Sequence, residues 1–384
     1  MVTEHGRHRR RRKPNAVVLV VAAVLVLAGA VMSVALLRGS GRTAHPASAG
    51  VTSALRGTGS ATSWPTTRRA TSASRPAGPA ASLAAPALGA SIPLGGTPQY
   101  AQVAPDGSFA YVTDPGAGTV LRVDTRTDAV TATVRVPQGP PQLLSFSADG
   151  RRAFVSVYDA KFMANYVVFV DTTTNAVTNA VVVDPGPYAV SPSPDGRTLY
   201  VPLYLQPRLD VIDIASAAVV GRIPAPANPH WVAYSKDGRF GYVTDHFSAV
   251  VSVLDVRRNT VVRTIPVGAG PHSIEAAPDG SRIALVNYIG GTASVIDPAT
   301  NTVVATVPNV GAQPQDVTYA PDGRHFYTAN NKDDTVSVVD TTTYTVVARV
   351  RTGASPTSVA VTPDGRKAYV TNFDDGTLRV LRTG

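Results

Sequence analysis

The sequence predicts an all-β fold built from repeated units, and two observations lead to that prediction. Sequence segments rich in Val, Ile, Thr and Tyr, which favour strands, flank short turns. An Asp-Gly pair recurs seven times at intervals of 42 to 46 residues, and its Asp residues are Asp106, Asp149, Asp195, Asp237, Asp279, Asp322 and Asp364. A sequence period of this length indicates one supersecondary unit per repeat.

The repeat from Pro271 to Pro314 shows the elements of one unit in order. Residues 272–277 predict a first strand. The hairpin turn after it is predicted at 278–280, because Pro fixes φ and Gly supplies the positive φ of a tight turn. Three further strands are predicted at residues 282–287, 293–297 and 302–307. Seven units of four antiparallel strands predict a seven-bladed β-propeller, whose blades leave only short sheet edges exposed.

The two ends of residues 91–384 predict how the ring of blades closes. The seventh repeat ends at Gly384 after three predicted strands, so its fourth strand is missing. The segment 91–98 matches the fourth-strand segment 264–271. We therefore expect the N-terminal segment to supply the outer strand of the last blade, which removes an exposed sheet edge. Within the ring, Pro202 predicts an irregular stretch, because Pro cannot donate a hydrogen bond to a neighbouring strand.

Residues 16–37 predict one transmembrane helix. They are apolar and uncharged, and at about 1.5 Å per residue they can cross a hydrocarbon core of roughly 30 Å. Residues 1–15 hold six Lys and Arg residues, so the positive-inside rule places this tail in the cytoplasm and residues 91–384 outside. The alternative is a cleaved secretory signal with a site at 47–49, which would make the product secreted.

Residues 38–90 predict a disordered stalk, because they consist mainly of Ala, Ser, Thr, Pro and Gly and hold almost no large apolar side chains. Residues 1–90 carry twelve Lys and Arg against Glu4 alone, a net charge of +11, so the total of +9 leaves −2 on residues 91–384. The basic character therefore belongs to the N-terminal part and indicates topology. We expect no nucleic-acid partner.

Short segments in the predicted second strands resemble a known repeat family. Three of them, each after an Asp-Gly turn, read Tyr-Val-Thr-Asp or Tyr-Val-Thr-Asn and lie at 111–114, 242–245 and 369–372. Over residues 91–384 the chain resembles the YVTN-repeat propellers, also called YncE-like or surface-layer-type repeats. The resemblance implies the propeller fold and leaves the function open, because the repeated residues belong to strands and turns.

The residue content excludes several classes of activity. The chain has no Cys, which excludes disulfides, thiol catalysis and Cys-ligated metal centres. Its sequence also lacks the common nucleophile motifs, the zinc-binding His motif and the phosphate loop. We expect a monomeric propeller without a cofactor that binds a protein, a peptide or a cell-wall polymer. Two alternatives stay open: a propeller lyase or lactonase, and a structural component of a surface layer.

The predicted binding face carries the loops that lead into each first strand and the loops between second and third strands, because these vary between repeats. The opposite face carries the uniform Asp-Gly turns. The ligand-binding residues predicted on the variable face are Tyr188, His230, Asp245, His246, His272, Glu275, Asn287, Gln315 and Asn330.

His272 and Glu275 are the catalytic residues of the enzyme hypothesis. Glu275 is the only Glu of residues 91–384, and His230 and His272 follow the first Pro of neighbouring repeats. Near a channel, His272 and Glu275 together would act as acid and base or hold a cation. The alternative is that the surrounding structure satisfies each side chain separately.

Metal binding by the loops stays open. The acidic pairs at 333–334 and 374–375 lack the spacing of calcium loops and suit turns equally well. Four extra residues in the second repeat, placed at 159–165, are either a contact for a partner or plain variation in loop length.

Overall fold

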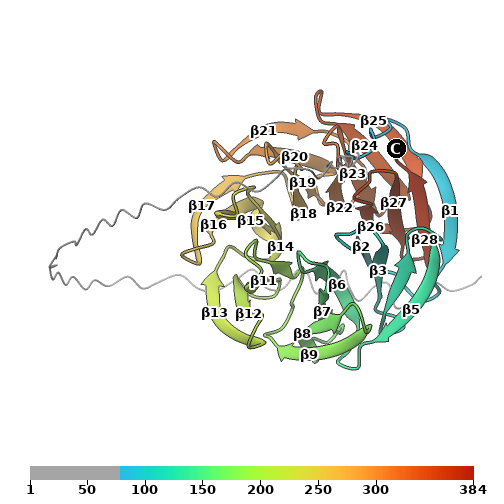
Figure 1. Cartoon of the computed structure of the whole chain (residues 1–384). Helices are drawn as coiled ribbons and strands as arrows, with labels where there is room; N and C mark the ends of the chain where they lie inside the picture. Colours follow the sequence, from blue (N-terminus) through green and yellow to red (C-terminus); the bar gives the residue numbers. More distant parts are fainter. Residues whose placement is uncertain (1–77) are drawn as a thin grey trace, which may run out of the picture. The chain divides into compact units, whose positions relative to one another are not determined.

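The computed structural model describes residues 78–384, which form seven four-stranded antiparallel sheets arranged in a ring (Figure 1). The prediction of an all-β, seven-bladed propeller is therefore confirmed. The predicted cytoplasmic tail, the transmembrane helix and the stalk up to residue 77 lie outside the described residues. Within the described part, no helix is long and apolar enough to cross a bilayer.

The first six blades take their strands in chain order from the centre of the ring outward, and the last blade adds β1 (Ala87–Pro93) outside its three C-terminal strands. The innermost strands are β2 (Tyr100–Val103), β6 (Pro141–Phe146), β10 (Ser191–Pro192), β14 (Pro229–Tyr234), β18 (Pro271–Ala276), β22 (Pro314–Tyr319) and β26 (Pro356–Val361). The second strands are β3 (Phe109–Asp114), β7 (Arg152–Tyr158), β11 (Thr198–Leu203), β15 (Phe240–Asp245), β19 (Ile283–Asn287), β23 (His325–Asn330) and β27 (Lys367–Asn372).

The third strands are β4 (Thr119–Asp124), β8 (Asn165–Asp171), β12 (Arg208–Asp213), β16 (Val250–Asp255), β20 (Thr292–Asp297), β24 (Thr335–Asp340) and β28 (Thr377–Arg382). The outermost strands are β5 (Ala129–Arg135), β9 (Ala176–Val182), β13 (Ala218–Pro224), β17 (Thr260–Pro266), β21 (Thr302–Val307), β25 (Thr345–Arg351) and β1 (Ala87–Pro93). A single 3-10 turn, η1 (His246–Ser248), follows β15. We number the blades 1 to 7 in chain order, so blade 7 combines β26, β27 and β28 with β1.

The N-terminal segment closes the ring, as the sequence predicts. β1 pairs antiparallel with β28, with Ile92 opposite Leu378, and forms the outer edge of blade 7 (Figure 1). One boundary differs from the prediction, because residues 78–90 were assigned to the stalk. In the structure β1 begins at Ala87, and the backbone N–H of Ser82 donates to Asp322 Oδ2 at 2.6 Å. These residues belong to the propeller because its backbone and side chains satisfy their hydrogen bonds.

A hydrogen bond between neighbouring blades explains why Tyr and Asn recur in the repeats. The Tyr of a second strand donates to the Asn of the outer turn in the next blade, and the bonds are Tyr111 to Asn175 (2.7 Å), Tyr200 to Asn259 (2.6 Å) and Tyr242 to Asn301 (2.7 Å). These Asn residues have φ of 52° to 56°, a left-handed conformation that Asn tolerates better than most residues. The turn residue therefore serves both the local backbone and the packing of the blades.

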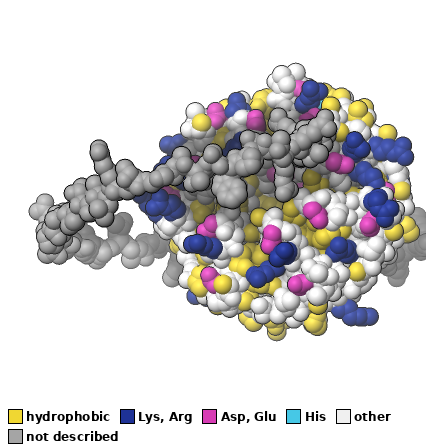
Figure 2. All heavy atoms as spheres, in the orientation of Figure 1, with side chains coloured by type: hydrophobic (Ala, Val, Ile, Leu, Met, Phe, Trp, Pro, Cys, Tyr) yellow, Lys and Arg dark blue, Asp and Glu magenta, His cyan; other side chains and the backbone are white. Residues whose placement is uncertain are grey.

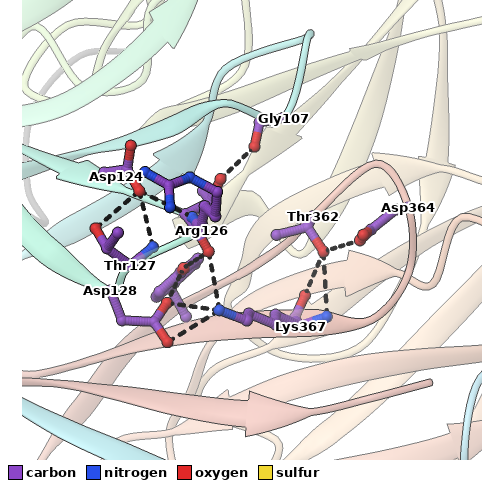
Figure 3. Close-up of polar contacts among 10 residues, drawn as sticks. Gly107, Asp124, Arg126, Thr127, Asp128, Thr362, Asp364 and Lys367 are labelled. Carbon is purple, nitrogen blue, oxygen red and sulfur yellow. Dashed lines mark hydrogen bonds and ion pairs between the residues drawn. The ribbon is translucent and has the colours of Figure 1, made fainter.

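The junction between blades 7 and 1 uses a charged version of this bond. Tyr369 donates to Asp128 at 2.5 Å, and the Lys367 ammonium group donates to the same carboxylate at 2.9 Å (Figure 3). Asp128, with φ of 57°, takes the place that Asn has in blades 2, 4 and 5. Charge-assisted hydrogen bonds are stronger than neutral ones, so this contact strengthens the junction between blade 7, which holds both terminal strands, and blade 1.

Blade 3 contains the irregularity that Pro202 predicts. β10 has only two residues, and beyond it a single bridge joins Pro187 to Leu203. Pro202 still pairs with Leu209 of the third strand and accepts the Tyr188 N–H at 2.9 Å, but it has no N–H of its own to donate inward. Tyr188 therefore stands on an irregular segment instead of a regular inner strand.

The core lies between neighbouring sheets. Between blades 1 and 2, Tyr111 and Phe109 pack on Phe146 and Val155, all of them buried. Fully burying one such side chain contributes about 1.5–3 kcal/mol. Six further clusters of buried apolar side chains fill the other interfaces between blades and hold the inner strands around the axis.

The ring has two faces, which we name by their turns. The Asp-Gly face carries the seven Asp-Gly turns and both ends of the described chain, since Ala80 N–H donates to the Asp364 carbonyl (2.8 Å) and Thr383 Oγ1 to the Gly365 carbonyl (2.8 Å). The opposite face, the loop face, carries the loops between second and third strands. Figure 2 shows acidic and basic side chains interspersed around the face turned to the viewer, outside the grey atoms.

Candidate functional site

His272 lies at the loop face and is held by two hydrogen bonds. Its Nδ1 is 2.7 Å from the backbone carbonyl of Gln315, and its Nε2 is 2.9 Å from the Tyr188 hydroxyl. Because a carbonyl oxygen only accepts, Nδ1 carries the proton and Nε2 accepts from Tyr188. Burial, with a smaller effect of His246, lowers the pKa of His272 to about 3, so the ring is neutral at physiological pH.

His230 and His246 complete a group of three imidazoles. The ring centroid of His230 lies 4.8 Å from that of His246 and 5.0 Å from that of His272. Burial lowers the pKa of His246 to about 4, and burial together with the other two imidazoles brings the pKa of His230 well below its usual value. The three predicted His residues therefore meet, as neutral rings packed on one another.

Further aromatic side chains enclose these imidazoles. Tyr188 lies edge-on 4.2 Å from His230, and Tyr288 stacks on His272 with centroids 5.5 Å apart. We use the name aromatic layer for the three imidazoles together with Tyr158, Phe162, Tyr188, Tyr204, Trp231 and Tyr288. This layer spans blades 2 to 5 and fills the loop-face side of the axis.

Three predicted residues, Asp245, Asn287 and Asn330, occupy equivalent places at the ends of second strands and are fully buried. Each forms a hydrogen bond of 2.6 to 2.9 Å within its own blade, and the partner hydroxyls are those of Ser252, Ser294 and Ser337. Burial raises the pKa of Asp245 to about 8, so its carboxyl is largely protonated near neutral pH and resembles the amides at the other two positions. These side chains are engaged by the blades that carry them.

Glu275 shares a strand with His272 but has different surroundings. Its Oε2 accepts the backbone N–H of Tyr319 at 3.0 Å, and the side chain lines the central cavity, whereas His272 lies in the aromatic layer. The structure therefore gives the two residues of the enzyme hypothesis separate partners. Gln315 takes part through its backbone carbonyl, which orients His272.

The central cavity has a volume of about 460 Å³ and is lined by the innermost strands of all seven blades. Its charged lining groups are the carboxyls of Glu275 and Asp316. The rings of Tyr100 and Trp231, from blades 1 and 4, lie 6.2 Å apart at the end of the cavity next to the aromatic layer. Among residues 78–384, no group of three His, Asp or Glu side chains is arranged to hold a metal ion.

Sequence reasoning missed the residues that shape this cavity. Tyr100, Trp231 and Asp316 each stand two residues after the first Pro of their repeat, in the same register of the inner strands. The residues predicted from the sequence on these strands stand one or four residues after that Pro, as His272 and Glu275 do. A comparison of every register position across the seven repeats would have found these three, because the other repeats have Leu, Ala or Ser there.

Comparisons with known proteins support the fold. The family model of the cytochrome D1 heme domain matches residues 205–318. No curated protein matches this chain. Among solved structures, a hydrazine synthase chain from Kuenenia stuttgartiensis is similar, with a TM-score of 0.67 and 24% sequence identity over 76% of this chain and 96% of that chain. At this level of identity the similarity shows a shared fold.

Proposed function

We propose that this chain is a membrane-anchored, extracytoplasmic propeller of the YVTN-repeat kind that binds a protein or peptide through its loop face. The observation that carries the proposal is a row of exposed apolar side chains in the loops of four consecutive blades. Met163, Leu205, Phe247 and Ile289 are 81%, 46%, 56% and 64% exposed. We name these four residues the apolar crescent. Apolar side chains exposed in the corresponding loops of neighbouring blades favour an interaction surface over isolated exposed residues.

The loops of the crescent are supported from below by the aromatic layer. The ring preceding Met163 is Phe162, which stacks on Tyr158 at 5.7 Å and contacts Tyr204 at 5.5 Å. His246 and Tyr288 precede Phe247 and Ile289 in the same way, with their ring centroids 5.9 Å apart. Because half-buried rings that pack on one another anchor these loops, little conformational entropy is lost when a partner binds.

The position of the chain ends supports the same proposal. Residues 78–86 lie on the Asp-Gly face, so the chain joins the propeller on the face opposite the crescent. The predicted span at 16–37 and the basic tail before it supply the anchor and its orientation. The crescent would then point toward partners outside the cell, and its apolar side chains favour a protein or peptide over a cell-wall polymer.

The described residues do not fit a heme group, although the matching family is named for one. The side chains that line the cavity include no His, Cys or Met to ligate iron. Both ring nitrogens of His272 already have partners, and His230 is enclosed by Tyr188 at 4.2 Å and Tyr204 at 6.1 Å. We therefore propose no heme for this propeller.

The lyase or lactonase hypothesis loses its geometric basis, because His272 and Glu275 hydrogen-bond to different groups. A general base and the residue that orients it must lie within hydrogen-bond reach. The His272 ring is also neutral and hydrogen-bonded through both nitrogens, which leaves it no free site for a substrate proton.

The proposal is tested by photo-crosslinking in intact cells that express the full chain. A photoreactive amino acid at position 247 should give a discrete adduct with one partner. The same amino acid at position 262 is the matched control, since Val262 is 51% exposed on the outer strand of the same blade. Replacing both Leu205 and Ile289 by Ser should abolish the adduct. Identical adducts from both positions, or none from position 247, would contradict the proposal.

A further inference from the structure

The central cavity reaches the Asp-Gly face and is closed toward the loop face. Exposed Ala148 and Pro194, next to two Asp-Gly turns, form part of its rim. At the other end Trp231 contacts Tyr100 at 6.2 Å and Tyr188 at 5.1 Å, and these rings separate the cavity from the imidazoles. A volume of about 460 Å³ lies within the range of roughly 300–1,000 Å³ found for small-molecule sites.

Two carboxyls from neighbouring blades face this cavity. Asp316 is 4% exposed and accepts hydrogen bonds from Ser273 Oγ (2.7 Å) and from the Val359 N–H (3.0 Å). Glu275 Oε2 accepts a hydrogen bond from the Tyr319 N–H at 3.0 Å, and the Thr318 side chain also interacts with this carboxyl. The proximity of both carboxylates to Tyr100 raises the pKa of that phenol beyond the larger effect of burial. The two carboxyls and Tyr100 therefore share one space.

No cation balances this pair within the described chain. None of the ion pairs in residues 78–384 includes Glu275 or Asp316, and the lining has no Lys, Arg or His. Burial raises the pKa of Glu275 to about 7, with a smaller effect of Asp316, and burial raises the pKa of Asp316 to about 6. Buried carboxylates without a counter-ion are costly, and a bound cation would offset that cost.

The other polar groups of the lining indicate the kind of cation. The side-chain oxygens of Gln102 and Ser145 are buried and have no hydrogen-bond partner. With the carboxylates they supply acceptors, which suit a ligand that carries several N–H donors. Tyr100 and Trp231 add aromatic surface, to which ammonium groups and their alkyl chains are attracted. A compact primary ammonium compound combines these properties, whereas a metal ion has no use for the aromatic wall.

We propose that the central cavity binds a small primary ammonium compound, with the charge held by Glu275 and Asp316 and the carbon chain placed against Tyr100 and Trp231. The ligand enters from the Asp-Gly face. This site is separate from the apolar crescent, so it stands independently of the proposed function.

The test is calorimetric titration of the full chain in detergent with 1,4-diaminobutane at pH 8. We expect binding to the wild-type protein and an affinity at least tenfold weaker in Glu275→Gln. Asp374→Asn is the matched control, since it removes an exposed carboxylate on the loop face and should leave the affinity unchanged. Thermal unfolding verifies the fold of both variants, and Asp316→Asn provides a second disruption of the site.

Competing ligands sharpen the test. We expect little binding of 1,4-butanediol, which has the same length and no charge, and weaker binding of tetramethylammonium, which has no N–H. Lowering the pH from 8 to 5.5 should weaken diamine binding more than tenfold, because both carboxyls become protonated. The neighbouring Tyr100 and Tyr319 have raised pKa values and stay neutral over this range. The imidazoles behind Trp231 have lowered pKa values and stay neutral as well.

Several results would overturn the proposal. They are equal affinity for the diol, unchanged affinity in Glu275→Gln, binding that does not depend on pH, and no binding of the diamine at millimolar concentration. Binding of Ca²⁺ in preference to the diamine would replace the ammonium ligand by a metal ion and would likewise reject it. Loss of crescent crosslinking with intact diamine binding would contradict only the proposed function.

Discussion

The loops of blades 3 to 5 and those of blades 6 and 7 have the same length and connect the same strands, yet they differ in what they present. In blades 6 and 7 the loop carboxylates bond to neighbouring backbone, with Asp333 accepting the Ala312 N–H (2.6 Å) and Asp375 the Ala354 N–H (2.6 Å). In blades 3 to 5 a half-buried ring anchors the loop and the next residue is apolar and exposed. The loops of blades 6 and 7 therefore stabilise the ring, and those of blades 3 to 5 leave side chains available for a partner.

The acidic pairs of these loops have hydrogen-bond partners in the structure. The acidic pairs could have been metal ligands or turn residues, and the structure shows their oxygens accepting hydrogen bonds from the loops beside them. Asp334 Oδ1 accepts the Ser355 N–H at 3.0 Å, and Asp374 Oδ2 accepts from Ser355 Oγ at 2.5 Å. The acidic loops are thus held in place by carboxylates that accept backbone N–H groups, whereas the apolar loops are held in place by packed rings.

Both groups of loops belong to one closed ring, and removal of β1 would open that ring at blade 7. A chain that starts at Pro98 loses the outer strand of blade 7 and the contacts of residues 78–86, which opens a sheet edge. We expect a loss of several kcal/mol, a large fraction of the roughly 5–15 kcal/mol that stabilises most domains. Urea unfolding of the propeller measures it. An unchanged midpoint would show that β1 does not contribute to closure.

Asp245→Asn would make blade 4 resemble blade 6, where Asn330 holds the same position. The pKa of Asp245 is raised to about 8 in the folded protein, so the wild type loses stability as the pH rises from about 4 to about 8. The variant avoids this loss and should be more stable at pH 8 by up to roughly 5 kcal/mol, since each pKa unit corresponds to about 1.4 kcal/mol, with little difference at pH 4. The three His residues titrate in both proteins, so their effect cancels in the difference. A constant difference across this pH range would contradict the burial of an uncompensated carboxyl.

Asp375→Ala tests the capping role of the loops in blades 6 and 7. It leaves the Ala354 N–H without its partner, and we expect a loss of about 1 kcal/mol in urea unfolding, without any effect on crosslinking from position 247. A larger effect on crosslinking than on stability would move the binding surface to these blades.

Ile289→Ser is the complementary change in blade 5. The side chain is 64% exposed, so stability should change by no more than about 0.5 kcal/mol, while the crosslinked adduct should weaken. Val304→Ser, 45% exposed on the outer strand of the same blade, is the matched control and should leave the adduct intact. Equal behaviour of the two variants would remove the distinction between the crescent and ordinary exposed apolar residues.

The sequence alone determined the repeat, the number of blades and the closing strand. These features are local or periodic: Asp-Gly pairs need a tight turn, Asn tolerates the left-handed conformation at 175, 259 and 301, and a missing fourth strand leaves an edge to be covered. The meeting of His230, His246 and His272 was also foreseeable in part, because equivalent positions of neighbouring blades lie close together. The boundary at residue 91 was misplaced, since nothing in the composition of 78–86 reveals its bonds to the Asp-Gly face.

Only the tertiary structure decided how these side chains are partnered. Glu275 and His272 are three residues apart on one strand, yet their side chains reach different surroundings. Asp316, Tyr100 and Trp231 come from three blades and share a cavity with Glu275 because the ring brings all seven inner strands to one axis. Sequence periodicity specifies which residues hold equivalent positions. The distance across the ring, the burial and the missing counter-charge exist only once the ring has closed.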